Sequence, residues 1–189
     1  HMNPDQPTKP GQEKKEPMKS EKEILWEQKL AEVGEIVDGL GEKVDERIKE
    51  PVVALLVHGF TTSASCEGHI AEKGEDEHGL SFPWVEVYAP APEGWEESEK
   101  KQREWTIENL KQQQKMMGLL EEFYKGRETS FDARLTFDRF GAFGGFHIQS
   151  FGAKMMALLT LEERKLKLEL YRKEMYDFTK FLKDKHFSK

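Results

Sequence analysis

A thiol and an imidazole stand three positions apart in the segment Cys66-Glu67-Gly68-His69, with a carboxylate between them. Thiols and imidazoles act as nucleophiles, as general bases and as ligands of zinc-type metals. Gly68 allows the backbone to turn sharply between the two groups, so we expect them to converge. We therefore take Cys66 and His69 as the candidate catalytic residues, with the thiol as the nucleophile and the imidazole as its base.

Two other chemistries fit the same segment. Cys66 and His69 also suit a zinc site, whose further ligands would come from His58, Glu67 or the run at residues 75–78, Glu-Asp-Glu-His. Zinc normally takes three or four protein ligands and the chain has one cysteine, so we assign no metal site from the sequence. In the third chemistry, backbone N–H groups and Thr/Ser hydroxyls of the turn hold an anion such as a phosphate or a carboxylate.

Residues around this pair are assigned as ligand-binding positions. They are Thr62, Ser65, Glu67 and Gly68 from the turn itself, and His147 from a strand further along the chain. The predicted partner is a small anionic ligand or a nucleotide, and the sequence indicates no particular cofactor. A structural explanation competes with this one, because a lone cysteine is usually a small buried apolar residue.

Composition and charge limit the classes of function. Of 189 residues, 36 are acidic and 29 are basic, which gives a formal net charge of -7. This charge argues against coating nucleic acid or an anionic membrane by bulk attraction. No apolar run approaches the roughly 20 residues that span a bilayer, and the first twenty residues contain no signal-peptide core. These features, together with the single cysteine, favour a cytoplasmic protein that does not enter membranes.

The first residues differ in character from the rest of the chain. His1-Met2 resembles a cloning remnant, and four prolines lie among polar and charged residues between positions 3 and 19. So few apolar side chains cannot offset the entropy of the chain. We therefore predict a disordered leader over residues 1–19 and a single domain over residues 20–189.

Apolar residues at helical spacing predict four helices. The first covers about residues 21–37 and ends at Gly39 and Gly41, and the second contains Pro51 and ends at Gly59. The third covers about residues 98–124, and the fourth begins after Thr160, which opens a capping box. The stripe that we expect the third helix to bury consists of Ile107, Leu110, Met117, Leu120 and Tyr124.

Alternating apolar residues predict strands over residues 82–88, 134–140 and 146–151, and the glycine-rich residues 141–145 join the last two as a hairpin. Residues 61–80 are polar and contain glycine, and we expect them to be irregular. The predicted fold class is therefore α+β, with a small, mainly antiparallel sheet of about three or more strands and helices packed on one face.

Two short stretches resemble parts of the α/β-hydrolase family. Residues 52–59 resemble its apolar strand ending in His-Gly, and Ser150 resembles the nucleophile of its Gly-x-Ser-x-Gly elbow. Ile148 replaces the first glycine of that elbow. The residues after Ser150 read as one helix, whereas the family carries its acid and base there. A degenerate hydrolase-like esterase is therefore a minor alternative.

The segment from Thr61 to Ile70 resembles the N-terminal motif of the wybutosine-synthesising tRNA methyltransferases, which carry Ser-Cys-Ser-Gly-Arg-Ile. Glu67 takes the place of the family's serine and His69 that of its arginine, and Trp84 matches the tryptophan of the strand that follows in the family. The resemblance covers roughly 30 residues of this chain. It implies S-adenosylmethionine and tRNA as ligands.

The sequence thus predicts a small-ligand or nucleotide-handling protein whose site lies on the turn Thr61–His69. The alternative from a different class is a non-catalytic interaction domain that binds a protein partner through its helical faces. A metal-stabilised loop is a third hypothesis. The sequence does not indicate a particular reaction.

Overall fold

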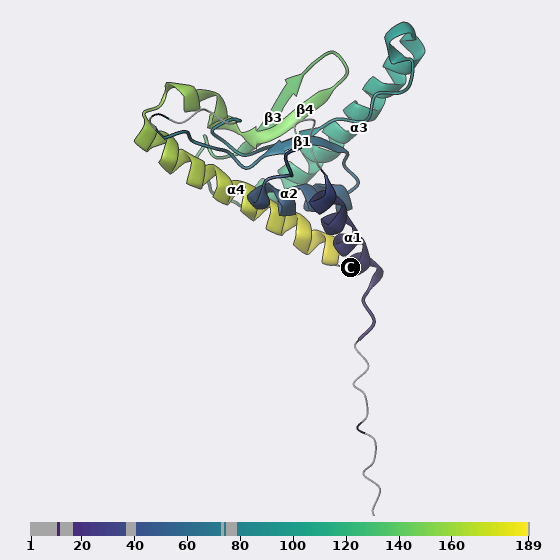
Figure 1. Cartoon of the computed structure of the whole chain (residues 1–189), viewed down its shortest axis with the longest axis horizontal. Helices are drawn as coiled ribbons and strands as arrows, with labels where there is room; N and C mark the ends of the chain where they lie inside the picture. The colour runs from purple at the N-terminus through teal and green to yellow at the C-terminus, as the bar shows by residue number, and fades with distance from the viewer. Residues whose placement is uncertain (1–10, 12–16, 37–40, 73, 75–78, 189) are drawn as a thin grey trace, which may run out of the picture.

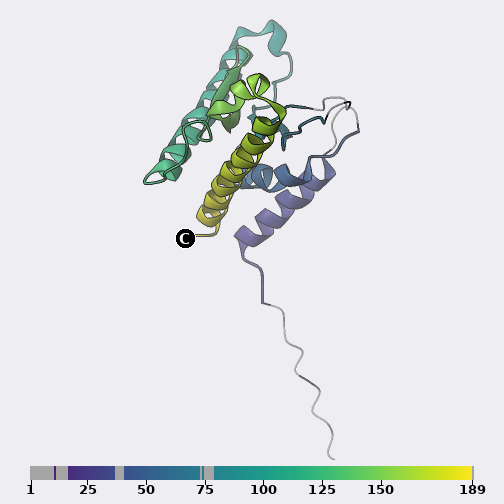
Figure 2. The same cartoon turned by 90° about the vertical axis from the view of Figure 1, so that its left-hand side faces the viewer.

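The computed structural model describes residues 11, 17–36, 41–72, 74 and 79–188. Helices make up most of this part of the chain, and its four strands form one antiparallel sheet, which confirms the predicted α+β class (Figures 1 and 2). The elements are α1 (Glu21–Glu35), α2 (Glu46–Val57), β1 (Thr62–Cys66), β2 (Trp84–Val87), η1 (Trp95–Glu97), α3 (Glu99–Tyr124), β3 (Leu135–Phe140), β4 (Gly145–Ser150), η2 (Phe151–Leu158) and α4 (Leu161–Phe187).

The sheet has the strand order β1-β2-β4-β3, so β1 and β3 are its edges. Side chains alternate across it because successive residues of a strand point to opposite faces. Val85, Val87, Phe146 and Ile148 on the inner face are buried, and they belong to one core with residues of α1, α2, α3 and α4. Figure 1 shows α2 and α4 along one side of the sheet.

Three helices begin and end largely where the sequence predicts. α4 opens with the capping box of Thr160 and Glu163. The apolar residues at helical spacing that predict this helix are all buried: Leu168, Tyr171, Met175, Phe178 and Leu182. The predicted helix around Pro51 is confirmed, because α2 runs through this proline without a break. Gly59 follows α2 at φ 86°, a conformation that suits glycine at a helix end. α1 ends at Glu35, and Gly39 lies outside the described residues.

The prediction for the third helix was wrong for three of the five residues of its stripe. α3 begins after Ser98 and ends at Tyr124, as expected, and Leu120 and Tyr124 are buried. Ile107, Leu110 and Met117 instead face solvent. Several of the buried positions beside them are occupied by amide side chains, namely Asn109, Gln112 and Gln113.

The prediction that residues 61–80 are irregular was also wrong at its start. Residues 62–66 form β1, which pairs with β2 at the edge of the sheet. The register shifts between Thr62 and Ala64, so the strand is bulged. A short, polar, bulged edge strand carries little hydrophobic alternation, which is why the pattern did not reveal it.

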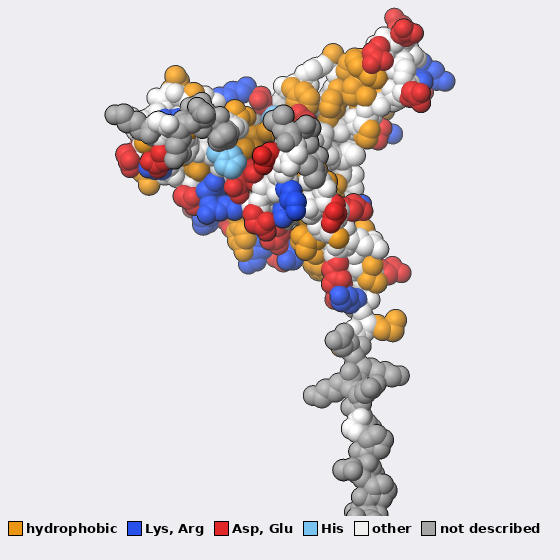
Figure 3. Space-filling view, viewed as in Figure 1, with side chains coloured by type: hydrophobic (Ala, Val, Ile, Leu, Met, Phe, Trp, Pro, Cys, Tyr) orange, Lys and Arg blue, Asp and Glu red, His pale blue; other side chains and the backbone are white. Residues whose placement is uncertain are grey.

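Most of the predicted leader lies outside the described residues. In the part of the chain that the structure describes, no helix combines the length and the apolar character needed to cross a bilayer. The face shown in Figure 3 carries acidic and basic side chains interspersed with one another.

Candidate functional site

Cys66 is the last residue of β1, opposite Trp84 of β2. Its side chain is 5% exposed, with Sγ placed 3.9 Å from the Leu80 carbonyl oxygen, to which the thiol donates. The Gly68 N–H donates to Sγ over 3.4 Å. Burial raises the pKa of the Cys66 thiol above its ordinary value, so the neutral thiol predominates at neutral pH in the absence of a bound cation.

Gly68 makes the sharp turn that the sequence predicts. Its φ of 86° lies in the left-handed region, and an added Cβ would lie 2.6 Å from Leu168 Cδ1 and 2.9 Å from the Phe82 carbonyl carbon. Arg172 of α4 fixes the turn from outside, because its guanidinium donates to the carbonyl oxygens of Glu67 and Gly68. Glycine is therefore required here both by conformation and by space.

His69 is held by Asp45, a residue that the sequence analysis did not select. Nε2 of His69 lies 3.0 Å from Oδ2 of Asp45. The same oxygen accepts the Glu67 N–H over 3.1 Å. Asp45 precedes α2 at the position of its N-cap, but its side chain makes no capping hydrogen bond. The carboxylate is thus turned away from its own helix and toward the segment after β1.

Asp45, Cys66 and His69 form a compact cluster of three metal-ligand types. Their ligand atoms all lie within 4.8 Å of one another. A carboxylate, a thiol and an imidazole are the three side-chain types that bind zinc in proteins. The sequence predicted the convergence of Cys66 and His69 but missed Asp45. The only sequence signal for Asp45 is its place before a helix, where an aspartate is normally a cap.

The other predicted ligand-binding residues are spread over a wider area. Thr62 lies at the far end of β1, four residues or roughly 13 Å of strand from Cys66. Ser65 precedes Cys66 in the same strand, and its side chain points to the opposite face. Glu67 accepts the Arg47 N–H through Oε2. Together with Gly68, these residues follow the course of β1 and the turn after it.

His147 lies on β4, two strands away from β1 in the sheet. Nε2 of His147 is 3.2 Å from Glu86 Oε1, and its ring stacks on Trp84 with centroids 4.4 Å apart. The structure thus places His147 in a separate aromatic and acidic cluster on the outer face of the sheet.

The backbone N–H groups of the turn are engaged within the chain. The Glu67 N–H donates to Asp45, the Gly68 N–H to Cys66 and the His69 N–H to the Leu80 carbonyl. A cradle for phosphate needs several successive N–H groups aimed at the same point. The geometry therefore gives no support to the hypothesis of a backbone anion site.

His58 and Ser150, which the sequence analysis also considered, make hydrogen bonds elsewhere in the fold. Nε2 of His58 lies 2.6 Å from the Leu182 carbonyl oxygen. Residues 75–78 lie outside the described residues. Ser150 is buried and donates to the Ala133 carbonyl, whereas an elbow serine presents its Oγ at the top of a sheet. Together with the antiparallel sheet and the helical residues 52–57, this speaks against the esterase hypothesis.

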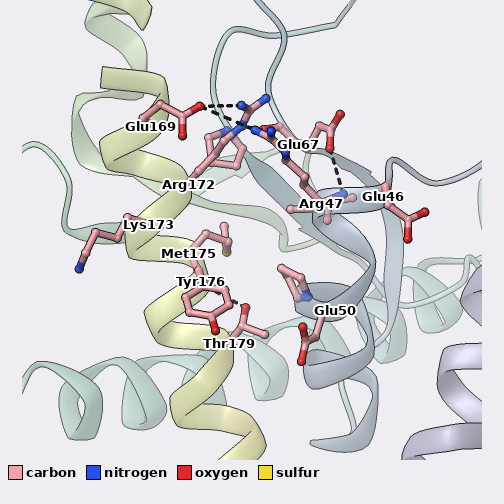
Figure 4. Close-up of a pocket in the computed structure, with 13 residues that line it drawn as sticks. Glu46, Arg47, Glu50, Glu67, Glu169, Arg172, Lys173, Met175, Tyr176 and Thr179 are labelled. Atoms are coloured by element: carbon pink, nitrogen blue, oxygen red, sulfur yellow. Dashed lines mark hydrogen bonds and ion pairs between the residues drawn. The ribbon is translucent and has the colours of Figure 1, made fainter. Parts of the chain in front are cut away.

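A pocket of about 420 Å³ lies between α2 and α4, beside the turn. Figure 4 shows Glu67, Arg47, Glu169 and Arg172 at one end of the pocket and Glu50 at the other. Glu67 is the only one of the predicted site residues in its lining; the thiol of Cys66 and the ring of His69 are outside it. The lining combines acids and bases, so the pocket has no strong preference for one sign of charge.

Comparison with protein-family models, with curated proteins and with solved structures gives no match to this chain.

Proposed function

We propose that this protein binds a divalent transition metal of the zinc type through Asp45, Cys66 and His69. The observation that carries the proposal is the approach of three different ligand atoms to within 4.8 Å of one another, although Asp45 is 24 residues away from His69 in the chain. Convergence from two distant segments is the arrangement expected of a site rather than of a local turn.

The distances require only a small adjustment. Zn–N and Zn–O bonds of about 2.0–2.1 Å and a Zn–S bond of about 2.3 Å place tetrahedral ligands roughly 3.3–3.6 Å apart. The cluster therefore closes around an ion by side-chain movements of about an ångström. Three protein ligands leave a fourth position for water or for a small anion, as in catalytic zinc sites. In this way the proposal accommodates the small anionic ligand that the sequence predicts.

Backbone groups support the two ligands that carry negative charge in the bound state. The Gly68 N–H donates to Sγ of Cys66, and the Glu67 N–H donates to Oδ2 of Asp45. Such outer contacts orient metal ligands and tune their basicity. A bound cation would also displace the thiol proton, because zinc binds thiolate.

A nucleophilic role for Cys66 fits the same three residues less well. A catalytic thiol is partly exposed and has a depressed pKa. Sγ of Cys66 is buried, its pKa is raised, and the thiol donates to the carbonyl of Leu80. The surroundings of the sulfur therefore favour coordination over attack on a substrate.

Titration of the metal-free protein with Co²⁺ tests the proposal. We expect one equivalent to bind, with the intense d–d bands of a tetrahedral ion and a thiolate-to-cobalt charge-transfer band, and Zn²⁺ to displace it. Cys66→Ser removes the charge-transfer band, and His69→Gln weakens binding at least tenfold, on the scale of losing one ligand. Absence of both band types in the wild-type spectrum would refute the proposal.

His147→Gln is the matched control. His147 also pairs with a carboxylate, at 3.2 Å from Glu86, but it lies outside the cluster. This variant should bind Co²⁺ like the wild type. Equal losses in His69→Gln and His147→Gln would instead point to nonspecific histidine binding.

We propose as a second candidate function that the protein handles a nucleotide, as the resemblance to wybutosine-synthesising tRNA methyltransferases implies. Two observations support it: Cys66 and Trp84, which carry the two parts of the motif, are direct partners across β1 and β2. The Trp84 ring stacks on His147, which in turn contacts Phe140, and these rings form an aromatic surface of the type on which bases stack.

Calorimetric titration with S-adenosylmethionine, followed by titration with tRNA, tests this second function. We expect Trp84→Ala to weaken binding at least tenfold and Trp95→Ala, which alters a different aromatic cluster, to leave it unchanged. Undetectable heat with both ligands would leave the metal as the sole candidate.

A further inference from the structure

The outward face of α3 carries a regular seam of six exposed residues. They occur at alternating spacings of four and three: Arg103, Ile107, Leu110, Gln114, Met117 and Glu121. Ile107, Leu110 and Met117 are 45%, 50% and 56% exposed. This spacing is that of the core positions of a coiled coil, which repeat every 3.5 residues and face a partner helix.

The two ends of the seam carry opposite charges that are not used within the chain. The side chains of Arg103 and Glu121 form no ion pair or hydrogen bond with any residue in the described part of the chain. Figure 2 shows α3 along one outer side of the molecule, with α4 between it and α1. The seam is therefore accessible to another molecule.

We propose that the seam pairs with the same seam of a second copy of this chain, with the two α3 helices antiparallel. About a two-fold axis near residue 112, Arg103 faces Glu121 of the second copy, Ile107 faces Met117, and Leu110 faces Gln114. Every member of the seam then has a partner, and the ion pair occurs twice because the interface is symmetric. The exposed Gly118 next to the seam lets the helices approach closely because it has no side chain, and no atom of its own chain lies within 4 Å of an added Cβ.

Charge disfavours the parallel arrangement. Parallel helices would place Arg103 against Arg103 of the second copy and Glu121 against Glu121. The antiparallel contact spans roughly 27 Å of helix from residue 103 to residue 121. One helix pair of this length lies at the small end of specific interfaces, so we expect a dissociation constant in the micromolar range.

Sedimentation of the full chain over a range of concentrations tests the proposal. The weight-average mass should rise from 22.0 kDa toward twice that value in the micromolar range. Arg103→Glu and Glu121→Arg should each weaken dimerisation about tenfold, because each replaces two attractive contacts by two repulsive ones. The double variant should regain the wild-type dissociation constant.

Lys180→Glu is the matched control. Like Arg103→Glu, it replaces a positive charge by a negative one, but at an exposed position of α4 outside the seam. This variant should leave dimerisation unchanged. A chain that stays monomeric throughout the range, or equal effects of Arg103→Glu and Lys180→Glu, would overturn the proposal.

Cross-linking tests the direction of the helices independently of charge. A mixture of Ile107→Cys and Met117→Cys chains should form a disulfide between the two variants under mild oxidation. Cross-linked Ile107→Cys homodimers in place of this mixed product would demonstrate parallel helices and contradict the register.

Discussion

The carboxylate of Asp45 lies 3.0 Å from Nε2 of His69 and makes no capping hydrogen bond to α2, whose Arg47 N–H donates to Oε2 of Glu67 instead. A capping side chain contributes about 0.5–2 kcal/mol to stability. An aspartate at this position has the right chemistry to supply it, yet its Oδ2 accepts from Glu67 and contacts His69 instead. Deviation from a local rule of stability is typical of functional positions.

Asp45→Asn separates the charge of this residue from its shape. The amide oxygen still accepts the Glu67 N–H, but a neutral amide is a poor ligand for zinc-type ions. We expect Co²⁺ affinity to fall at least tenfold, while the free energy of unfolding of the metal-free protein changes by less than about 1 kcal/mol. Asp138→Asn, on the surface strand β3, is the control and should retain full affinity. Unchanged Co²⁺ affinity in Asp45→Asn would remove this carboxylate from the site.

Gly68→Ala tests the turn that brings His69 to Cys66. The new methyl group would occupy a left-handed backbone position and lie 2.6 Å from Leu168 Cδ1. Strain and overpacking together should lower the free energy of unfolding by about 2–4 kcal/mol, measured in urea. Co²⁺ binding should weaken as well, because any relief of the overlap moves the segment that carries His69.

Gly34→Ala provides the comparison for this substitution. Gly34 is inside α1, and no atom lies within 4 Å of an added Cβ. Alanine there should stabilise the protein by about 0.5–1 kcal/mol, since glycine is a poor helix former. If both alanine variants were equally stable, the steric argument for Gly68 would be wrong.

The sequence predicted the buried face of an element well where that face is apolar and poorly where it carries polar side chains. The periodicity of α4 identified its buried apolar residues but not the buried Glu174 and Thr179, and alternation identified β2, β3 and β4, because these elements bury hydrocarbon. In α3 the buried face includes Asn109, which accepts the Ala89 N–H and donates to the Phe143 carbonyl. A buried amide that serves loop backbones is indistinguishable in sequence from an exposed one.

Substitutions of Asn109 and Leu110 therefore compare the apolar face that the sequence predicted to be buried with the face of α3 that the structure buries. Asn109→Leu should destabilise the protein by about 2–4 kcal/mol, because it leaves the buried Ala89 N–H and the part-buried Phe143 carbonyl without partners. Leu110→Asn should change stability by less than about 0.5 kcal/mol in the monomer, since this side chain faces solvent. Urea unfolding at concentrations below the expected dimer range measures both. If Leu110→Asn destabilised the protein more than Asn109→Leu does, the result would support the predicted apolar stripe and contradict the structure.

The candidate site was predictable only where its residues are close in sequence. Gly68 between Cys66 and His69 implied a turn, and the turn brings both side chains into one cluster. Asp45 joins them only because α2 begins beside the end of β1, which is a tertiary relationship. The strand β1 was also hard to predict, because a polar, bulged edge strand has a residue pattern similar to that of a loop.

His58 should make the stability of the fold depend on pH near neutrality. Burial, together with the positive charge of Lys115, lowers the pKa of His58 below its ordinary value of 6.5 and outweighs the hydrogen bond to Leu182. Below about pH 6.5 the unfolded chain therefore binds more protons at this residue than the folded protein does, and the free energy of unfolding falls as the pH decreases.

His58→Gln retains a donor for the Leu182 carbonyl but does not titrate. Urea unfolding from about pH 7.5 to about pH 5.5 should show a shallower loss of stability in the variant than in the wild type. Parallel curves would show that protonation of His58 costs the folded protein nothing.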